Sequence, residues 1–142
     1  MILFHSKTTF NLKKKLQYKN CIRLLLVVEN KKEGEINFIF CDDEYLLGIN
    51  KQYLQHDDLT DVITFDYSEK REISGDIFIS IERVAVNAKE YATTFQEELV
   101  RVIVHGISHL CGYKDKTATE IVKMRKKENN AIKYFHKLMF DK

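Results

Sequence analysis

Residues 99–112 read Leu-Val-Arg-Val-Ile-Val-His-Gly-Ile-Ser-His-Leu-Cys-Gly, the most apolar helical segment of the chain. Placed on a helical wheel at about 100° per residue, its apolar side chains fill a broad arc that must be buried. Its polar side chains form a narrow stripe, which contains Arg101, His105, Ser108 and His109. The stretch therefore predicts a helix that crosses the hydrophobic core and carries two imidazoles one turn apart on its polar edge.

Two histidines four residues apart on a helix are spaced as zinc motifs require, with two ring nitrogens on one cation. Gly106 occupies the position at which the His-Glu-x-x-His motif carries its general base. Gly112 can end the helix in a left-handed conformation and so bring Asp115 to the histidines. His105, His109 and Asp115 would then hold zinc and leave a fourth position for water, as catalytic sites do. The alternative is a polar stripe that contacts a neighbouring loop.

Length and composition indicate a single-domain protein without disulfides or membrane spans. The 142 residues suit one domain with one core, and we expect it to span residues 1–142. There is no proline, low-complexity tract or repeat to mark a linker. Three cysteines without a Cys-x-x-Cys pair argue against a disulfide framework. The longest apolar run, Leu24–Val28, is far below the roughly 20 residues that span a bilayer, so we expect a cytoplasmic protein with no membrane partner.

Periodicity and turn signals predict an α+β fold, with strands in the first half of the chain and helices mainly in the second. The predicted strands are short and rich in β-branched and aromatic residues, and they cover about residues 2–4, 36–40, 61–67 and 76–81. The predicted helices cover about residues 11–29, 43–54, 82–92, 96–111 and 117–140.

Capping residues and apolar faces predict how these helices begin and pack. Thr8 or Thr9 could cap the first helix and Asp42 the second, while Thr117 and Glu120 form a capping box for the last. The inward face of the first helix is predicted to be Leu12, Leu16, Ile22 and Leu26. The inward stripe of the last helix is predicted to be mostly apolar, with Ile121, Met124, Glu128, Ala131, Ile132, Phe135 and Leu138.

Three blocks of sequence carry a resemblance to a known family. Residues 105–113 read His-Gly-Ile-Ser-His-Leu-Cys-Gly-Tyr and resemble the His-Gly-x-Leu-His-Leu-x-Gly-Tyr signature of the YbeY family, bacterial metal-dependent endoribonucleases of rRNA maturation. Residues 50–65 contain Asn-x-x-Tyr, Asp and Thr-Asp-Val-Ile-Thr-Phe, which resemble that family's Asn-x-x-Tyr, Asp and Thr-Asp-Val-Leu-Ser-Phe. Gly-Asp-Ile at 75–77 resembles its third block. Order and spacing agree over about residues 36–136.

Three positions depart from the family pattern. Asp115 stands where the family usually has a third histidine, a change that zinc tolerates because it also accepts carboxylate oxygen. Leu54 stands where the family commonly has an arginine associated with activity, and leucine cannot stabilise a phosphate. Ser108 replaces a leucine, which makes the stripe more polar. The candidates to supply the missing catalytic cation are His56, Arg101 and Lys114.

The resemblance implies a mixed sheet of about four strands packed with helices, and a zincin-like helix that holds one Zn²⁺ per chain. It further implies a single-strand-specific endoribonuclease that matures the 3′ end of 16S rRNA in ribosome biogenesis, with zinc activating water or polarising the scissile phosphate. The implied partners are single-stranded rRNA of the small ribosomal subunit and ribosomal or GTPase assembly factors. Asp61, Asp76 and Ser108 are candidates to orient the ligand histidines.

Two other functions use the same residues. A small metallopeptidase would bind zinc through the same histidines, but Gly106 leaves it without its usual base. A ribosome-assembly factor could hold a structural zinc and dock on rRNA through basic helices, and the leucine at position 54 favours this alternative.

The net charge of +2 is a cancellation between regions of opposite sign. Residues 1–39 carry eight basic and three acidic side chains, and residues 114–142 carry nine and four. Residues 40–98 carry five basic and fourteen acidic side chains. The last helix is therefore predicted to contact RNA phosphates through Lys123, Lys126 and Lys127, the alternative being a solvated lysine face.

Overall fold

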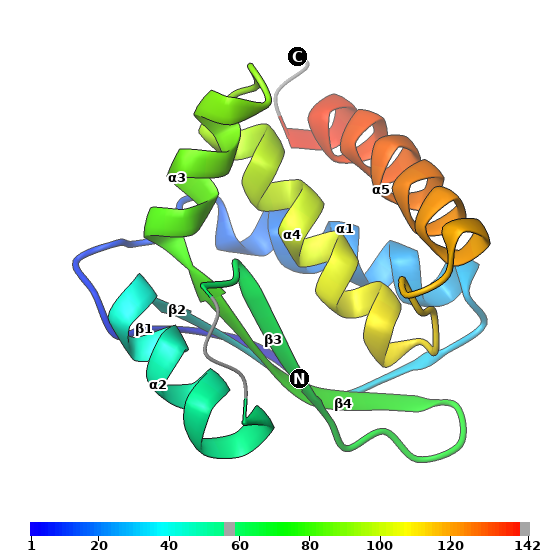
Figure 1. The fold of residues 1–142 in the computed structure, drawn as a ribbon. Coiled ribbons are helices and arrows are strands. Elements are labelled where there is room, and N and C mark those ends of the chain that lie inside the picture. The colour runs from blue at the N-terminus through cyan, green and yellow to red at the C-terminus, as the bar shows by residue number, and fades with distance from the viewer. Residues whose placement is uncertain (56–58, 140–142) are drawn as a thin grey trace.

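A four-stranded mixed sheet in the order β1-β2-β4-β3 organises the protein, with helices on both of its faces (Figure 1). The structure is a computed structural model and describes residues 1–55 and 59–139. The strands are β1 (Ile2–Ser6), β2 (Lys32–Cys41), β3 (Val62–Asp66) and β4 (Glu72–Ser80). The helices are α1 (Lys15–Val28), α2 (Asp43–Leu54), α3 (Ile81–Glu90), α4 (Phe95–Leu110) and α5 (Ala118–Met139).

The sheet combines parallel and antiparallel pairing. β2 lies between β1 and β4 and is parallel to both, while β3 runs antiparallel to β4 at the edge. The predicted α+β class and mixed four-stranded sheet are therefore confirmed. β2 begins before the predicted residue 36, because a bulge between Glu33 and Ile36 interrupts the alternation but not the pairing with β4.

Each face of the sheet packs against different helices. Side chains of α1, α4 and α5 join Phe38, Ile77 and Ile79 of the sheet in the main core. A smaller cluster on the other face joins Leu46 of α2 to Ile63. Figure 1 shows α4 between α3 and α5, over the β3 and β4 side of the sheet. No helix in the described residues is both long enough and apolar enough to cross a membrane.

The helix α4 is buried as its sequence predicts. The apolar arc, from Leu99 through Ile103 to Leu110, lies in the main core. Gly106 faces β4 so closely that a Cβ atom at this position would lie 2.9 Å from Ile77 Cγ2. A side chain at 106 would therefore separate the helix from the sheet, and no catalytic glutamate fits there.

Two of the three predicted helix caps are present in the structure, and one is wrong. Asp42 accepts a hydrogen bond from the Tyr45 N–H, so α2 has the predicted bounds. The capping box of α5 is also present, with Thr117 N–H donating to Glu120 and the Glu120 N–H donating to the Thr117 hydroxyl. The cap predicted at Thr8 or Thr9 is wrong. α1 instead begins after Lys14, whose φ of 57° is left-handed and whose side chain makes no cap.

Three predicted inward side chains are exposed. Leu16 is 64% exposed, because α1 starts later than predicted and its first turn faces solvent. Ile121 and Leu138 are exposed at the two ends of α5. Met139, rather than Leu138, joins the core at the C-terminal end, because the long stripe drifts around the helix at 3.6 residues per turn.

Candidate metal centre

The polar stripe of α4 and the turn after it bring three potential metal ligands together. His105 and His109 lie one turn apart on α4. Gly112 then takes a φ of +101°, and the Tyr113 N–H donates back to the Ser108 carbonyl at 3.0 Å, so the chain reverses. This reversal, which glycine permits without steric cost, places Asp115 beside the two imidazoles.

The distances among the three side chains suit a small cation. The Nε2 atoms of His105 and His109 are 3.0 Å apart, and Asp115 Oδ2 lies 3.1 Å from the first and 3.6 Å from the second. A tetrahedral zinc ion with ligands at about 2.0–2.1 Å separates neighbouring ligand atoms by about 3.3 Å. The observed separations lie on both sides of that value. Two nitrogens and one carboxylate oxygen are also a donor set that zinc accepts.

Glu128 on α5 orients the first imidazole. Its Oε2 lies 2.7 Å from His105 Nδ1, which leaves Nε2 of that ring facing His109 and Asp115. Burial alone would lower the pKa of His105, but the hydrogen bond and negative charge of Glu128, with Asp115 and Asp61, raise it above 6.5. For His109, burial and then the charge of His105 lower the pKa.

The carboxylate of Glu128 is itself held by cations. Arg101 Nη1 donates to Glu128 Oε1 at 3.0 Å, and Arg125 Nη1 lies 3.4 Å from the same oxygen. Burial would raise the pKa of Glu128, but the hydrogen bonds from His105 and Arg101 and the cationic charges lower it. Glu128 therefore stays ionised and fixes the ring orientation.

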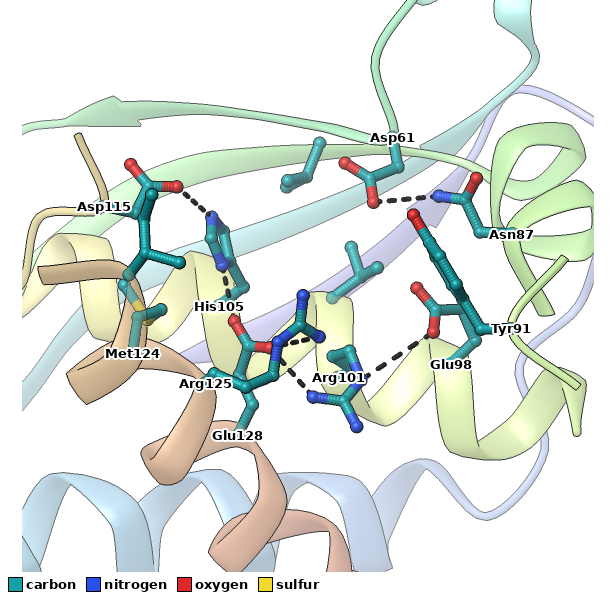
Figure 2. Close-up of a pocket in the computed structure, with 13 residues that line it drawn as sticks. Asp61, Asn87, Tyr91, Glu98, Arg101, His105, Asp115, Met124, Arg125 and Glu128 are labelled. Carbon is teal, nitrogen blue, oxygen red and sulfur yellow. Dashed lines mark hydrogen bonds and ion pairs between the residues drawn. The ribbon is translucent and has the colours of Figure 1, made fainter. Parts of the chain in front are cut away.

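One side of α4, from Glu98 to His105, lines a cleft that α3, α5 and the segment before β3 complete (Figure 2). Four carboxylates and two guanidinium groups line it among the described residues, namely Asp61, Glu98, Asp115, Glu128, Arg101 and Arg125. The carboxylates outnumber the guanidinium groups, so an anionic ligand would need an added cation in the cleft.

The residues predicted to orient the histidines are not all in place to do so. Asp61 lines the cleft but accepts its side-chain hydrogen bond from Asn87 Nδ2, at 3.3 Å. Burial is the main cause that raises the pKa of Asp61. Asp76 accepts from Asn37 and Tyr67 and points to the face opposite α4, because its neighbour Ile77 faces α4. The structure does not bring Asp76 to the histidines.

Ser108 and the predicted catalytic cations lie in different surroundings. Ser108 is buried on α4, and its carbonyl closes the turn that carries Asp115. Arg101 lines the cleft, but Glu128 and Asn129 already accept its hydrogen bonds. Lys114 is exposed in the loop next to Asp115, and His56 lies outside the described residues.

The three lysines of α5 that are predicted to contact RNA lie on different sides of the helix. Lys127 pairs with Glu29 and lies 4.5 Å from the centroid of the Tyr113 ring. Lys123 lies 5.3 Å from the same centroid. Lys126 is exposed on another side of α5, beside Lys133.

Sequence reasoning missed the residue that holds His105. Glu128 is the only acidic member of the predicted apolar stripe of α5. A charged residue at an inward position is a signal by itself, because a buried carboxylate needs a partner. The roles of Glu98 and Arg125 in the cleft had no comparable signal, since the spacing of α5 against α4 cannot be read from either helix alone.

Comparisons with known proteins show the family of this chain and agree with its fold. The family model described as Endoribonuclease YbeY matches residues 3–136. A protein named Endoribonuclease YbeY from Flavobacterium psychrophilum is 54% identical over 136 residues, which are 96% of this chain and 97% of the relative. One of the same name from Flavobacterium johnsoniae is 53% identical, over 96% of this chain and 98% of the relative.

A solved structure shares the fold as well. The solution structure of a Thermotoga maritima protein superposes with a TM-score of 0.67 and 26% sequence identity, over 96% of this chain and 89% of that chain. Together with the family match over residues 3–136, these similarities cover almost the whole sequence. The chain therefore belongs to the endoribonuclease YbeY family.

Proposed function

We propose that this protein is a zinc-dependent endoribonuclease that cleaves single-stranded rRNA during maturation of the small ribosomal subunit. The observation that carries the proposal is the convergence of His105, His109 and Asp115, whose ligand atoms all lie within 4.8 Å of one another. Family membership supports RNA as the substrate class. The 3′ end of 16S rRNA, a cytoplasmic site of action and contact with ribosomal or GTPase assembly factors belong to the same proposal.

The proposed site assigns distinct tasks to the protein's own residues. When bound, the zinc ion would supply Lewis-acid chemistry, polarising a phosphoryl oxygen or making water more acidic. His105, His109 and Asp115 would hold it, and Glu128 would keep the proton of His105 on Nδ1. Asp61 adds negative charge near His105 without a hydrogen bond to it.

Arg125 is our candidate for the cation that Leu54 cannot supply. It lines the cleft, its side chain is more than half exposed, and its contact with Glu128 is 3.4 Å long. Arg101 is less free, because its guanidinium donates to Glu128 and Asn129. An exposed guanidinium beside the metal ligands can turn toward a phosphate and stabilise the charge that develops there.

A cleavage assay tests this function. Purified protein would be given a single-stranded rRNA fragment with zinc, with a chelator, and with zinc after the substitution His109→Ala. Of these three conditions, we expect cleavage only by wild type with zinc. The control variant His5→Ala should also cleave with zinc, because His5 lies on β1, where it is hydrogen-bonded to Asn37 of β2 and is not a metal ligand. Equal cleavage in all three conditions would show that a contaminating nuclease or another site is responsible.

The second candidate is a zinc-containing assembly factor without nuclease activity, which the leucine at position 54 favours. It predicts one bound zinc per chain and metal-dependent RNA binding, but no cleavage in the same assay. A metallopeptidase is disfavoured further by the packing of Gly106 on Ile77, which leaves no room for a glutamate.

A further inference from the structure

Glu98 is a buried carboxylate that the metal site does not use. It lies in the first turns of α4, is 3% exposed, and lines the cleft. Its Oε1 accepts no hydrogen bond from the described residues, and the nearest cation, Arg101 Nε, is 3.8 Å away. A buried carboxylate oxygen that has a long ion pair but no hydrogen bond is costly, so a ligand that donates hydrogen bonds would be favoured there.

A second metal ion does not explain Glu98. Among the described residues, only His105, His109 and Asp115 bring three potential ligand atoms within metal-binding reach of one another. The other carboxylate on this side of the cleft, Asp61, is engaged by Asn87. A ligand group with N–H donors, rather than a second metal ion, would therefore bind Glu98.

We propose that Glu98, Arg101 and Tyr91 form a pocket for a guanine base of the RNA substrate. This inference rests on the proposed function, because it names the nucleotide that would lie beside the metal centre. The cleft has a volume of about 310 Å³, at the small end of the range of roughly 300–1,000 Å³ typical of ligand pockets. That volume suits one nucleotide rather than a structured RNA element.

The hydrogen-bonding edge of guanine is complementary to the side chains of Glu98 and Arg101. Guanine presents two adjacent N–H donors, N1 and N2, which one carboxylate can accept together, and its O6 can accept from a guanidinium. Arg101 uses one hydrogen bond each to Glu128 and Asn129, so further N–H groups of its five donors remain for O6. Adenine, cytosine and uracil each place an acceptor next to their donor, and that acceptor would face the carboxylate.

Tyr91 supplies the flat surface on which a base can stack. It follows the last turn of α3, is 66% exposed, and lines the same cleft as Glu98. Figure 2 shows Tyr91 and Glu98 toward one end of the cleft and His105 and Asp115 toward the other. A base on Tyr91 would leave its sugar and phosphate to extend along the cleft toward the metal ligands, as single-stranded RNA recognition requires.

Nucleotide binding tests the pocket without relying on cleavage. We would titrate zinc-loaded protein with GMP, AMP, CMP and UMP and compare the dissociation constants. GMP should bind about tenfold more tightly than the other three, the discrimination expected of a two-bond contact to one base. Glu98→Gln should remove this preference, because an amide offers a donor where guanine also donates. Glu97→Gln makes the same change one residue earlier on α4, outside the cleft, and should keep the preference.

A second variant covers the case in which Glu98→Gln does not fold. Tyr91→Ala changes an exposed side chain, and it should weaken all four nucleotides about tenfold by removing the stacking surface. Tyr91→Phe should bind like wild type. Three results would overturn the proposal: equal or undetectable binding of the four nucleotides by wild type, a guanine preference that survives Glu98→Gln, or nucleotide affinities that Tyr91→Ala leaves unchanged.

Cleavage mapping separates this inference from the function on which it rests. If wild type cuts mixed-sequence RNA next to guanines and Glu98→Gln cuts without that preference, the nuclease function and the guanine pocket are both supported. Cutting without any base preference would overturn the guanine pocket alone. A guanine preference in binding without any cleavage would overturn the nuclease function and leave the pocket standing.

Discussion

At the residue scale, Glu128 decides which nitrogen of His105 is available to a metal. Its carboxylate lies 2.7 Å from Nδ1, is buried, and is held in turn by Arg101. A ligand histidine with one nitrogen fixed this way has its tautomer and ring angle set before the metal arrives. The metal affinity should therefore depend on a residue that is not itself a ligand.

We predict that Glu128→Gln lowers zinc affinity by about 10–100-fold while one zinc still binds at saturation. The amide keeps the size of the side chain but removes the negative charge that favours the Nδ1 proton. Competition with a chromophoric zinc chelator measures the affinity, and circular dichroism checks the fold. Glu90→Gln, an exposed change outside the cleft, is the control. Wild-type affinity in Glu128→Gln would show that this carboxylate does not tune the site.

Gly106 is required for a different reason, the close approach of α4 to β4. A Cβ at 106 would lie 2.9 Å from Ile77 Cγ2, which is not the end of a flexible side chain. We predict that Gly106→Ala destabilises the protein by about 1–3 kcal/mol, through overpacking that outweighs the better helix propensity of alanine. Urea denaturation measures the change.

Gly48 is the matched control for that substitution. It lies within α2, and a Cβ there would meet nothing within 4 Å. Gly48→Ala should therefore stabilise the protein by about 0.5–1 kcal/mol. If both variants shift in the same direction by the same amount, the contact of α4 with Ile77 does not constrain position 106.

At the element scale, Asp43 joins the starts of α2 and α3. It accepts from the Ser80 hydroxyl at 2.7 Å and from Arg83 Nη2 at 2.8 Å, while Ser80 also caps α3 by accepting from the Arg83 N–H. Burial would raise the pKa of Asp43, but the hydrogen bonds from Arg83 and Ser80 and the charge of Arg83 lower it below 3.8. Two helices on different faces of the sheet edge are thus tied through one carboxylate.

This link gives stability a pH dependence. Because the pKa of Asp43 is lower in the folded state, its contribution is complete above pH 3.8 and is lost as the pH falls through the folded-state pKa. We predict that Asp43→Asn costs about 1 kcal/mol at pH 7, and that its difference from wild type shrinks below pH 3.8. Urea denaturation at several pH values measures it. Glu44→Gln, an exposed change on the same helix, should give no such trend, and a constant gap for Asp43→Asn would contradict the account.

The elements also show which parts of the fold could be predicted. Asp42 and the Thr117–Glu120 pair set the starts of α2 and α5, because capping depends on residues next to each other in sequence. The start of α1 could not be predicted in this way, since Lys14 begins it without a side-chain cap. The metal triad follows from one helix and its turn, whereas Glu128 reaches His105 only through the packing of α5 on α4.

At the scale of the whole molecule, the two basic ends of the chain lie together. α1 and α5 pack on each other, with Tyr18 against Phe135 at 6.3 Å between ring centroids and Lys14 Nζ donating to the Met139 carbonyl. The acidic middle of the chain contributes Asp61 and Glu98 to the cleft. The basic helices α1 and α5 are therefore neighbours in space, and α5 also lines the acidic cleft.

We predict that reversing two charges of α5, with Lys126→Glu and Lys133→Glu together, weakens single-stranded RNA binding more than the same charge change elsewhere. Both residues lie on the same surface of α5, away from the Tyr113 contact that holds Lys123 and Lys127. If each contacts one phosphate, the slope of log affinity against log salt should fall by about 1.4 in magnitude. Fluorescence anisotropy at several salt concentrations measures it.

The control for RNA binding is the same charge change elsewhere. Lys7→Glu with Lys70→Glu alters two exposed lysines, one after β1 and one between β3 and β4, and should reduce affinity much less. Equal losses in the two double variants would mean that net charge rather than the α5 surface attracts the RNA.

The metal content of purified protein shows whether His105, His109 and Asp115 form one metal site. Elemental analysis of protein prepared with zinc should find about one zinc per chain in wild type, and Asp115→Ala should lose most of it, because two imidazoles alone bind too weakly. Asp115→His should retain the metal, since a third imidazole is an equally suitable ligand. Full zinc occupancy in Asp115→Ala, or no zinc in wild type, would show that these three side chains do not form a zinc site.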